Sequence, residues 1–163
     1  MGVKIKTNNM IQRIQTFWLL ISAISSGFLT RGGIIDFINR EGQKYFTGFS
    51  GISKLNELGH EVIIRSVPLE ILIILILLLS VISILSFKSR RIQKIVTLMV
   101  IGFSICLIIL VSYYSYFLVK NYNAELVPGI KMFFPLIILI SVVLAYRGIS
   151  KDENLVKSYD RLR

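Results

Sequence analysis

Four blocks of apolar residues, separated by shorter polar segments, dominate the pattern along the chain. Residues 14–30, 71–87, 95–119 and 132–146 contain no charged side chain. A helix needs about 20 mainly apolar residues to cross roughly 30 Å of hydrocarbon. The second and third blocks meet that length, and the first and fourth reach it with flanking residues. The pattern predicts four membrane-spanning helices over residues 11–30, 68–87, 92–119 and 128–147.

The segment between the first two helices, residues 31–67, is the one sizeable part expected outside the membrane. Two strand-like runs, IIDFI and KYFTGF, flank the sequence NREGQ, whose glycine favours a turn. A later run, EVIIRSV, is rich in β-branched residues and is a possible third strand. The stretch SGISKLNELGH is interpreted as a short helix or a loop. We expect a β-hairpin or small sheet lying over the ends of the helices.

The closing segment has the features of a separate short helix. Gly148 suits the residue that ends a helix, and Ser150 with Glu153 matches a capping box that begins a new one. Over residues 151–162 an apolar stripe recurs at spacings of four and three: Leu155, Tyr159 and Leu162. About 12 residues are marginal as a free helix, so the stripe is expected to dock on something. The predicted fold class is therefore all-α membrane: a four-helix transmembrane bundle with a small outer sheet and a short C-terminal amphipathic helix.

Two alternatives concern the beginning of the chain. Residues 1–9 are polar, and we expect a disordered extension before a membrane domain over residues 10–163. The first apolar block also has a basic start and small residues at Ala23 and Ser25, as in a signal peptide. Its cleavage would leave three spans in the same orientation.

The formal net charge of +10 indicates an orientation rather than a nucleic-acid partner. Twelve of the 19 lysine and arginine residues, but three of the nine acidic residues, lie in the two terminal segments and in and beside the short connection KSRR. Basic residues gather in the cytoplasmic segments of membrane proteins. We therefore expect a multi-pass membrane protein with both termini in the cytoplasm.

No pattern in the chain predicts a reaction. The single histidine, His60, and the single cysteine, Cys106, have no partner at metal-ligand spacing. Nucleophile, phosphate-loop and zinc-protease motifs do not occur. We expect no catalytic residue, metal or cofactor, and a protein that is not an enzyme.

Three stretches resemble one protein family. They are MIQRIQTFWLL at residues 10–20, FKSRRIQ at 87–93 and LAYRGISKDENLVKSYDRLR at 144–163. Together they resemble an uncharacterised four-helix membrane protein family of Bacteroidota, domain of unknown function 4293. Ser89 and Tyr146 stand where the family often has asparagine, and Gly148 stands for an alanine. The resemblance implies a four-span inner-membrane protein and no activity.

These motif residues would share one side of the bilayer, where they form either an internal network that locks the helix ends or a docking face. The leading hypothesis is a non-enzymatic scaffold protein whose cytoplasmic face binds a protein partner, through the C-terminal tail, or anionic lipid. The residues expected in that face are Arg13, Arg90, Arg91, Lys157, Tyr159, Arg161, Leu162 and Arg163. The alternative is a small-molecule or lipid carrier that uses the bundle interior near the stripe Ser80, Ser83 and Ser86. The sequence indicates neither the partner nor the oligomeric state.

Overall fold

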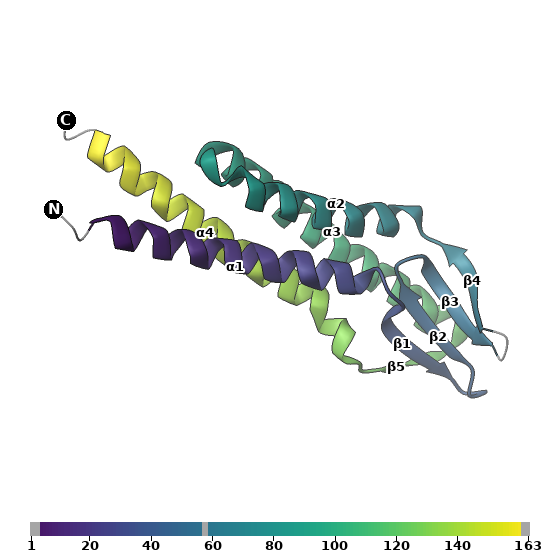
Figure 1. Cartoon of the computed structure of the whole chain (residues 1–163). Helices are drawn as coiled ribbons and strands as arrows, with labels where there is room; N and C mark the ends of the chain where they lie inside the picture. Colours follow the sequence, from purple (N-terminus) through teal and green to yellow (C-terminus); the bar gives the residue numbers. More distant parts are fainter. Residues whose placement is uncertain (1–3, 57–58, 161–163) are drawn as a thin grey trace.

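Four long helices form an antiparallel bundle in the computed structural model, which describes residues 4–56 and 59–160 (Figure 1). They are α1 (Lys4–Leu29), α2 (Val67–Leu85), α3 (Arg90–Tyr122) and α4 (Phe134–Asp160). Each helix packs against its two neighbours in the ring α1–α2–α3–α4. The 3-10 turn η1 (Ser86–Lys88) connects α2 to α3, and a second turn, η2 (Ile130–Phe133), leads into α4.

The two ends of the bundle differ. The start of α1, the end of α4 and the α2–α3 connection lie at one end, called here the termini end (Figure 1). There α1 and α4 extend beyond the α2–α3 connection (Figure 1). All the strands lie at the other end, the sheet end.

The sheet has five strands, two more than the sequence indicates. They are β1 (Gly33–Asn39), β2 (Lys44–Gly48), β3 (Gly51–Asn56), β4 (Gly59–Arg65) and β5 (Ala124–Val127), in the order β4-β3-β2-β1-β5 with antiparallel neighbours. The predicted hairpin is β1–β2, and Gly42 takes the positive φ of 76° that its turn requires. The possible third strand lies within β4. The helix or loop expected over SGISKLNELGH is wrong, because residues 51–56 form β3 between β2 and β4.

One face of the sheet closes the bundle and the other faces away from it. Phe37 pairs with Tyr45, and Thr47 with Ile52, and all four side chains are buried. The three apolar ones belong to the same core cluster as Leu118 of α3. Cross-strand partners share a face, so Asp36 with Phe46 and Ile38 with Lys44 lie on the opposite face.

The outward faces of the helices are apolar. In α1, large apolar side chains recur at spacings of three and four, and each is 44–57% exposed: Ile14, Phe17, Leu20, Ile24 and Phe28. Similar exposed isoleucine and leucine side chains follow α2, α3 and α4. Among the described residues, three segments are long and apolar enough to cross a membrane: Val67–Leu85, Arg90–Tyr122 and Ile130–Glu153. Helix α1 contributes a shorter apolar stretch, Ile14–Leu29.

Three boundaries differ from those predicted. Residues 4–9, expected to be disordered, are helical and belong to α1; residues 1–3 lie outside the described part. The fourth helix begins at Phe134 rather than at residue 128, because residues 130–133 form the 3-10 turn η2 after strand β5. Helix α4 then continues to Asp160, so the predicted break into a separate helix at 151–162 is wrong.

Candidate functional site

A buried carboxylate joins three helices at the termini end. Asp152 of α4 is 5% exposed and accepts a hydrogen bond from the Gln15 amide nitrogen of α1 at 2.8 Å. The same carboxylate oxygen, Oδ2, lies 2.9 Å from Nη1 of Arg90, in the first turn of α3. A buried charge is costly unless it is both paired and hydrogen-bonded, and Asp152 meets both conditions. Its position therefore fixes α1, α3 and α4 relative to one another.

A second ion pair lies beside the first. The Lys94 ammonium of α3 lies 2.8 Å from Glu153 Oε2 of α4. It also lies 5.9 Å from the centroid of the Tyr146 ring, within the range of a cation–π contact. Both side chains are partly exposed, so this pair contributes less than a buried one. It reinforces the contact between α3 and α4 at the same level as Asp152.

Hydroxyl pairs join the helices deeper in the bundle. Ser22 of α1 and Ser80 of α2 lie 3.1 Å apart, and Ser83 of α2 lies 2.8 Å from Thr97 of α3. The Thr97 hydroxyl donates to the carbonyl of Gln93, so Ser83 is the donor in its pair. With the contacts of Asp152, each neighbouring pair in the ring of four helices has a polar contact. We call this set the polar ties: Ser22–Ser80, Ser83–Thr97, Arg90–Asp152, Lys94–Glu153 and Gln15–Asp152.

The polar ties use the serines on which the carrier hypothesis depends. Ser80 and Ser83 bond across helices, and Ser86 donates to the Ile82 carbonyl at 2.8 Å. A ligand in this stripe would have to break these hydrogen bonds. A small cavity of about 20 Å³ beside Arg90 and Gln93 has room for about one water molecule.

Gly148 allows close contact between α1 and α4 and does not end a helix. A Cβ atom at this position would lie 2.8 Å from Cγ of Gln15. The missing side chain therefore leaves room for Gln15 as it reaches Asp152. Glycine in a helix costs about 1 kcal/mol relative to alanine, which packing between two helices can outweigh. The stop predicted at Gly148 is therefore wrong, because the local pattern carries no sign of this contact with another helix.

The predicted helix cap at Ser150 and Glu153 is also wrong. Ser150 lies inside α4, and its buried hydroxyl has no hydrogen-bond partner in the described part of the chain. The Glu153 carboxylate pairs with Lys94 rather than with a backbone N–H at a helix start. A capping box needs a free helix end, and a continuous helix offers none.

The predicted partner-binding residues separate into three groups. Arg90 is engaged with Asp152, and its neighbour Arg91 is exposed. Arg13 belongs to α1, and Lys157 and Tyr159 to α4, in stretches whose side chains lie outside the description. Arg161, Leu162 and Arg163 lie outside the described residues. Among residues 4–56 and 59–160, no group of three or more His, Cys, Asp or Glu side chains is placed to hold a metal ion.

The family model for Domain of unknown function (DUF4293) matches residues 11–162. The chain belongs to this family. No curated protein and no solved structure shows significant similarity to this DUF4293 chain. The match includes both helices that carry Gln15 and Asp152.

The internal network at the termini end could be predicted in part from the sequence. Motif residues on one side of the bilayer were predicted to form either an internal network or a docking face, and Gln15, Asp152 and Glu153 of the DUF4293 chain do form an internal network. The signal was the concentration of polar residues of both signs in segments that border apolar blocks. The pairing of individual residues carried no local signal, because each pair joins different helices.

Proposed function

We propose that this chain is an integral membrane protein with four spans, and that it acts as a non-enzymatic scaffold in the bacterial inner membrane. The observation that carries the membrane assignment is the apolar outward face of all four helices. Soluble monomers rarely expose apolar patches of more than a few hundred Å². The stripe from Ile14 to Phe28 gives α1 the same outward face as the three longer apolar helices, which supports its place as the fourth span. The resemblance to a Bacteroidota family points to the same membrane.

The distribution of charge supports an orientation with the termini end in the cytoplasm. Arg90, Arg91 and Lys94 follow the short α2–α3 connection, and short connections obey the positive-inside tendency best. The two terminal segments at the same end carry most of the remaining excess of basic residues. The sheet would then face the periplasm.

Cysteine labelling in intact cells tests this orientation. In a Cys106→Ala background, Glu41→Cys places a thiol in the exposed β1–β2 turn, and Ser158→Cys places one near the end of α4. A membrane-impermeant maleimide should label position 41 in intact spheroplasts and position 158 only after permeabilisation. Labelling of position 158 in intact spheroplasts would overturn the orientation. Absence of labelling at both positions in intact spheroplasts, with labelling of both after permeabilisation, would overturn the membrane-spanning assignment.

The scaffold role depends on the helices at the termini end. Helix α4 continues past Glu153 by seven residues, which extends it by about 10 Å along its own axis. A tail that lies flat on the inner leaflet would have to turn away from the bundle, and the uninterrupted helix has no such turn. The continuous helix therefore favours a cytoplasmic protein partner over anionic lipid. The apolar stripe expected from the sequence supplies the contact surface: Leu155 and Tyr159 belong to this extension, and Leu162 lies outside the described residues.

Photo-crosslinking in cells tests the partner. A benzoylphenylalanine at positions 155, 156 and 159, one at a time, should give a discrete protein adduct at one position or more. The matched control is Tyr116→benzoylphenylalanine, at an exposed position on α3 near the sheet end, which should not give that adduct. Adducts with lipid alone would replace the protein partner by the membrane surface. No adduct at any tail position would refute docking through the tail.

Truncation needs care, because the polar ties include tail residues. A chain that ends after Ser150 loses both Asp152 and Glu153, so reduced binding could reflect a loosened bundle. A chain that ends after Glu153 keeps both ion pairs. If docking is the function of the tail, this shorter deletion should abolish co-purification of the crosslinked partner with the protein in mild detergent, while leaving the unfolding transition of the bundle unchanged.

A further inference from the structure

A groove runs over the face of the sheet that points away from the bundle. Its larger part has a volume of about 320 Å³ and lies across β1, β2, β3 and β5. The register places its key side chains on one face, since Asp36 pairs with both Phe46 and Val127, and Lys44 pairs with both Ile38 and Leu55. This volume is at the lower end of the range for small-molecule sites, about 300–1,000 Å³.

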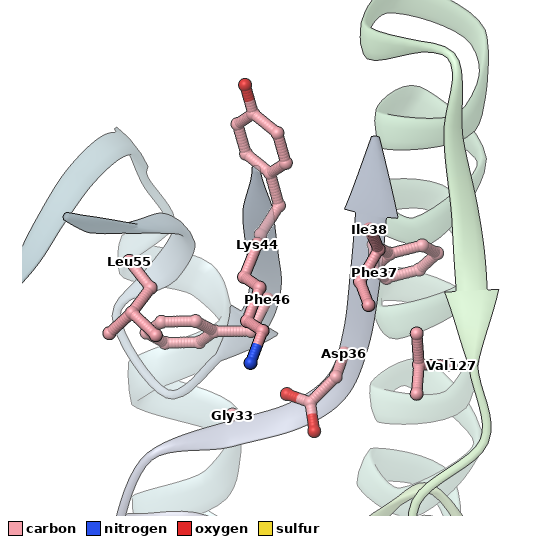
Figure 2. Close-up of a pocket in the computed structure, with 9 residues that line it drawn as sticks. Gly33, Asp36, Phe37, Ile38, Lys44, Phe46, Leu55 and Val127 are labelled. Atoms are coloured by element: carbon pink, nitrogen blue, oxygen red, sulfur yellow. The ribbon is translucent and has the colours of Figure 1, made fainter. Parts of the chain in front are cut away.

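Two opposite charges stand in the wall of this groove without pairing. Figure 2 shows the Asp36 carboxylate and the Lys44 ammonium directed toward the same space, with Phe46 and Leu55 on one side and Val127 on the other. They are diagonal neighbours across β1 and β2, yet neither forms an ion pair or hydrogen bond with any described residue. The groove therefore offers one negative and one positive group, with apolar side chains beside them.

Glycine keeps the end of the groove beside Asp36 open. A Cβ atom at Gly33 would lie 2.8 Å from Asp36 Oδ1 and 2.9 Å from Phe46 Cβ. A side chain at this position would displace both the carboxylate and the aromatic wall. A smaller hollow of about 180 Å³ adjoins the first, shares Phe46 with it and is lined by the polar residues Ser50 and Ser53.

We propose that this groove binds an apolar amino acid or short apolar peptide with both ends free. The ammonium end would lie against Asp36, the carboxylate end against Lys44, and the apolar side chain against Phe46, Leu55 and Val127. A simple anion would be repelled by Asp36 and a simple cation by Lys44. A zwitterion satisfies both charges, so the pair selects this class of ligand by attraction and by repulsion.

The test titrates the dipeptide Leu-Phe into the full-length protein in lipid nanodiscs, followed by calorimetry, with empty nanodiscs as the blank. Three ligands are compared: the free dipeptide, its N-acetylated form and its C-terminal amide. Loss of one charge-assisted contact should weaken binding about tenfold, so each blocked form should bind about tenfold more weakly than the free dipeptide.

Protein variants assign each end. In Asp36→Asn the acetylated and free dipeptides should bind equally, and in Lys44→Gln the amide and free dipeptide should bind equally. Arg40→Gln, at an exposed position in the β1–β2 turn, is the matched control and should leave the affinities for all three ligands unchanged.

Three results would overturn the proposal. They are the absence of saturable binding up to about 10 mM peptide, blocked peptides that bind as tightly as the free one, or peptide affinities that are the same in Asp36→Asn, Lys44→Gln and the natural chain. The comparison of blocked and free ligands uses the natural chain, so it decides the matter even if a variant fails to fold.

Discussion

Removing the Asp152 carboxylate should loosen the bundle in a way that identifies its partners. The substitution Asp152→Ala deletes the acceptor shared by Gln15 and Arg90. The Gln15 side chain is then left without its hydrogen bond at a site where the residue is 5% exposed. The Arg90 guanidinium keeps partial access to solvent, since its side chain is 30% exposed.

The expected magnitude follows from these exposures. Breaking a fully buried ion pair by removing one partner costs about 3–5 kcal/mol, whereas an exposed pair contributes at most about 1 kcal/mol. The Arg90–Asp152 pair lies between these limits. A hydrogen bond to a charged group contributes about 1.5–3 kcal/mol. We expect Asp152→Ala to lower the free energy of unfolding by about 3 kcal/mol, with coupling energies of about 1.5 kcal/mol to Gln15 and about 1 kcal/mol to Arg90.

The assay is a pair of double-mutant cycles on the purified protein in mixed micelles, unfolded reversibly with sodium dodecyl sulfate and followed by circular dichroism. One cycle combines Asp152→Ala with Gln15→Ala, and the other combines it with Arg90→Ala. The control cycle combines Asp152→Ala with Arg65→Ala, at the sheet end, where Arg65 pairs with Glu70. Distant sites should be additive within about 0.5 kcal/mol.

The predicted coupling of Asp152 to Gln15 and Arg90 is refuted if both test cycles are as additive as the control. That result would mean that Gln15 and Arg90 gain as much from water or lipid as from Asp152. Coupling to Arg90 alone would show that the ion pair, and not the link between α1 and α4, carries the stability of the termini end.

Three further predictions concern other contacts. Gly148→Ala should stabilise the bundle by about 1 kcal/mol in a Gln15→Ala background and by less in the natural chain. In the natural chain the added methyl group would clash with the Gln15 side chain. The same micellar unfolding experiment measures the difference. Ser83→Ala should cost about 0.6 kcal/mol, and at most about 1.7 kcal/mol, if its bond to Thr97 has the usual strength of an interhelical bond in lipid; a stabilised variant would contradict this. Burial, with nearby Tyr122 and Glu41, raises the pKa of Tyr45 in the sheet. The neutral phenol therefore stabilises the fold below the unfolded pKa of about 10, and this contribution is lost as pH rises through the folded pKa. The thermal midpoint of the natural chain should fall above about pH 10 more steeply than that of Tyr45→Phe.

The helices could be predicted because their signal is local. Each apolar block exceeds or approaches the length of a span, and α2 and α3 lie within a few residues of their predicted bounds. The β1–β2 hairpin was also found, since its turn and both strands lie within one short window. A local sequence pattern is enough to predict elements of this kind.

The missed elements depend on distant parts of the chain. Strand β5 was not predicted, because residues 124–127 lie between the third and fourth predicted helices and only their pairing with β1 makes them a strand. Strand β3 is rich in glycine, serine and asparagine, and it forms because both of its edges find partners. The stop predicted at Gly148 failed for a related reason: the intrinsic cost of glycine in a helix is small, and contact with Gln15 on another helix outweighs it.

The polar ties also determine which face of each helix packs inward, although helices such as α2 are apolar on nearly every side. Helix α2 is apolar almost all round. In the proposed membrane setting, where lipid is as apolar as a leucine side chain, burial alone would give α2 little reason to prefer one rotation. Ser80 and Ser83 break this symmetry, because their hydroxyls find partners only when they face α1 and α3. At the termini end Asp152 does the same for α4 and thereby sets the direction in which residues 154–160 leave the bundle. If that extension binds a partner, Asp152→Ala should weaken crosslinking at position 159 although it changes no residue of the contact surface, whereas Ser83→Ala, on the other side of the ring, should not.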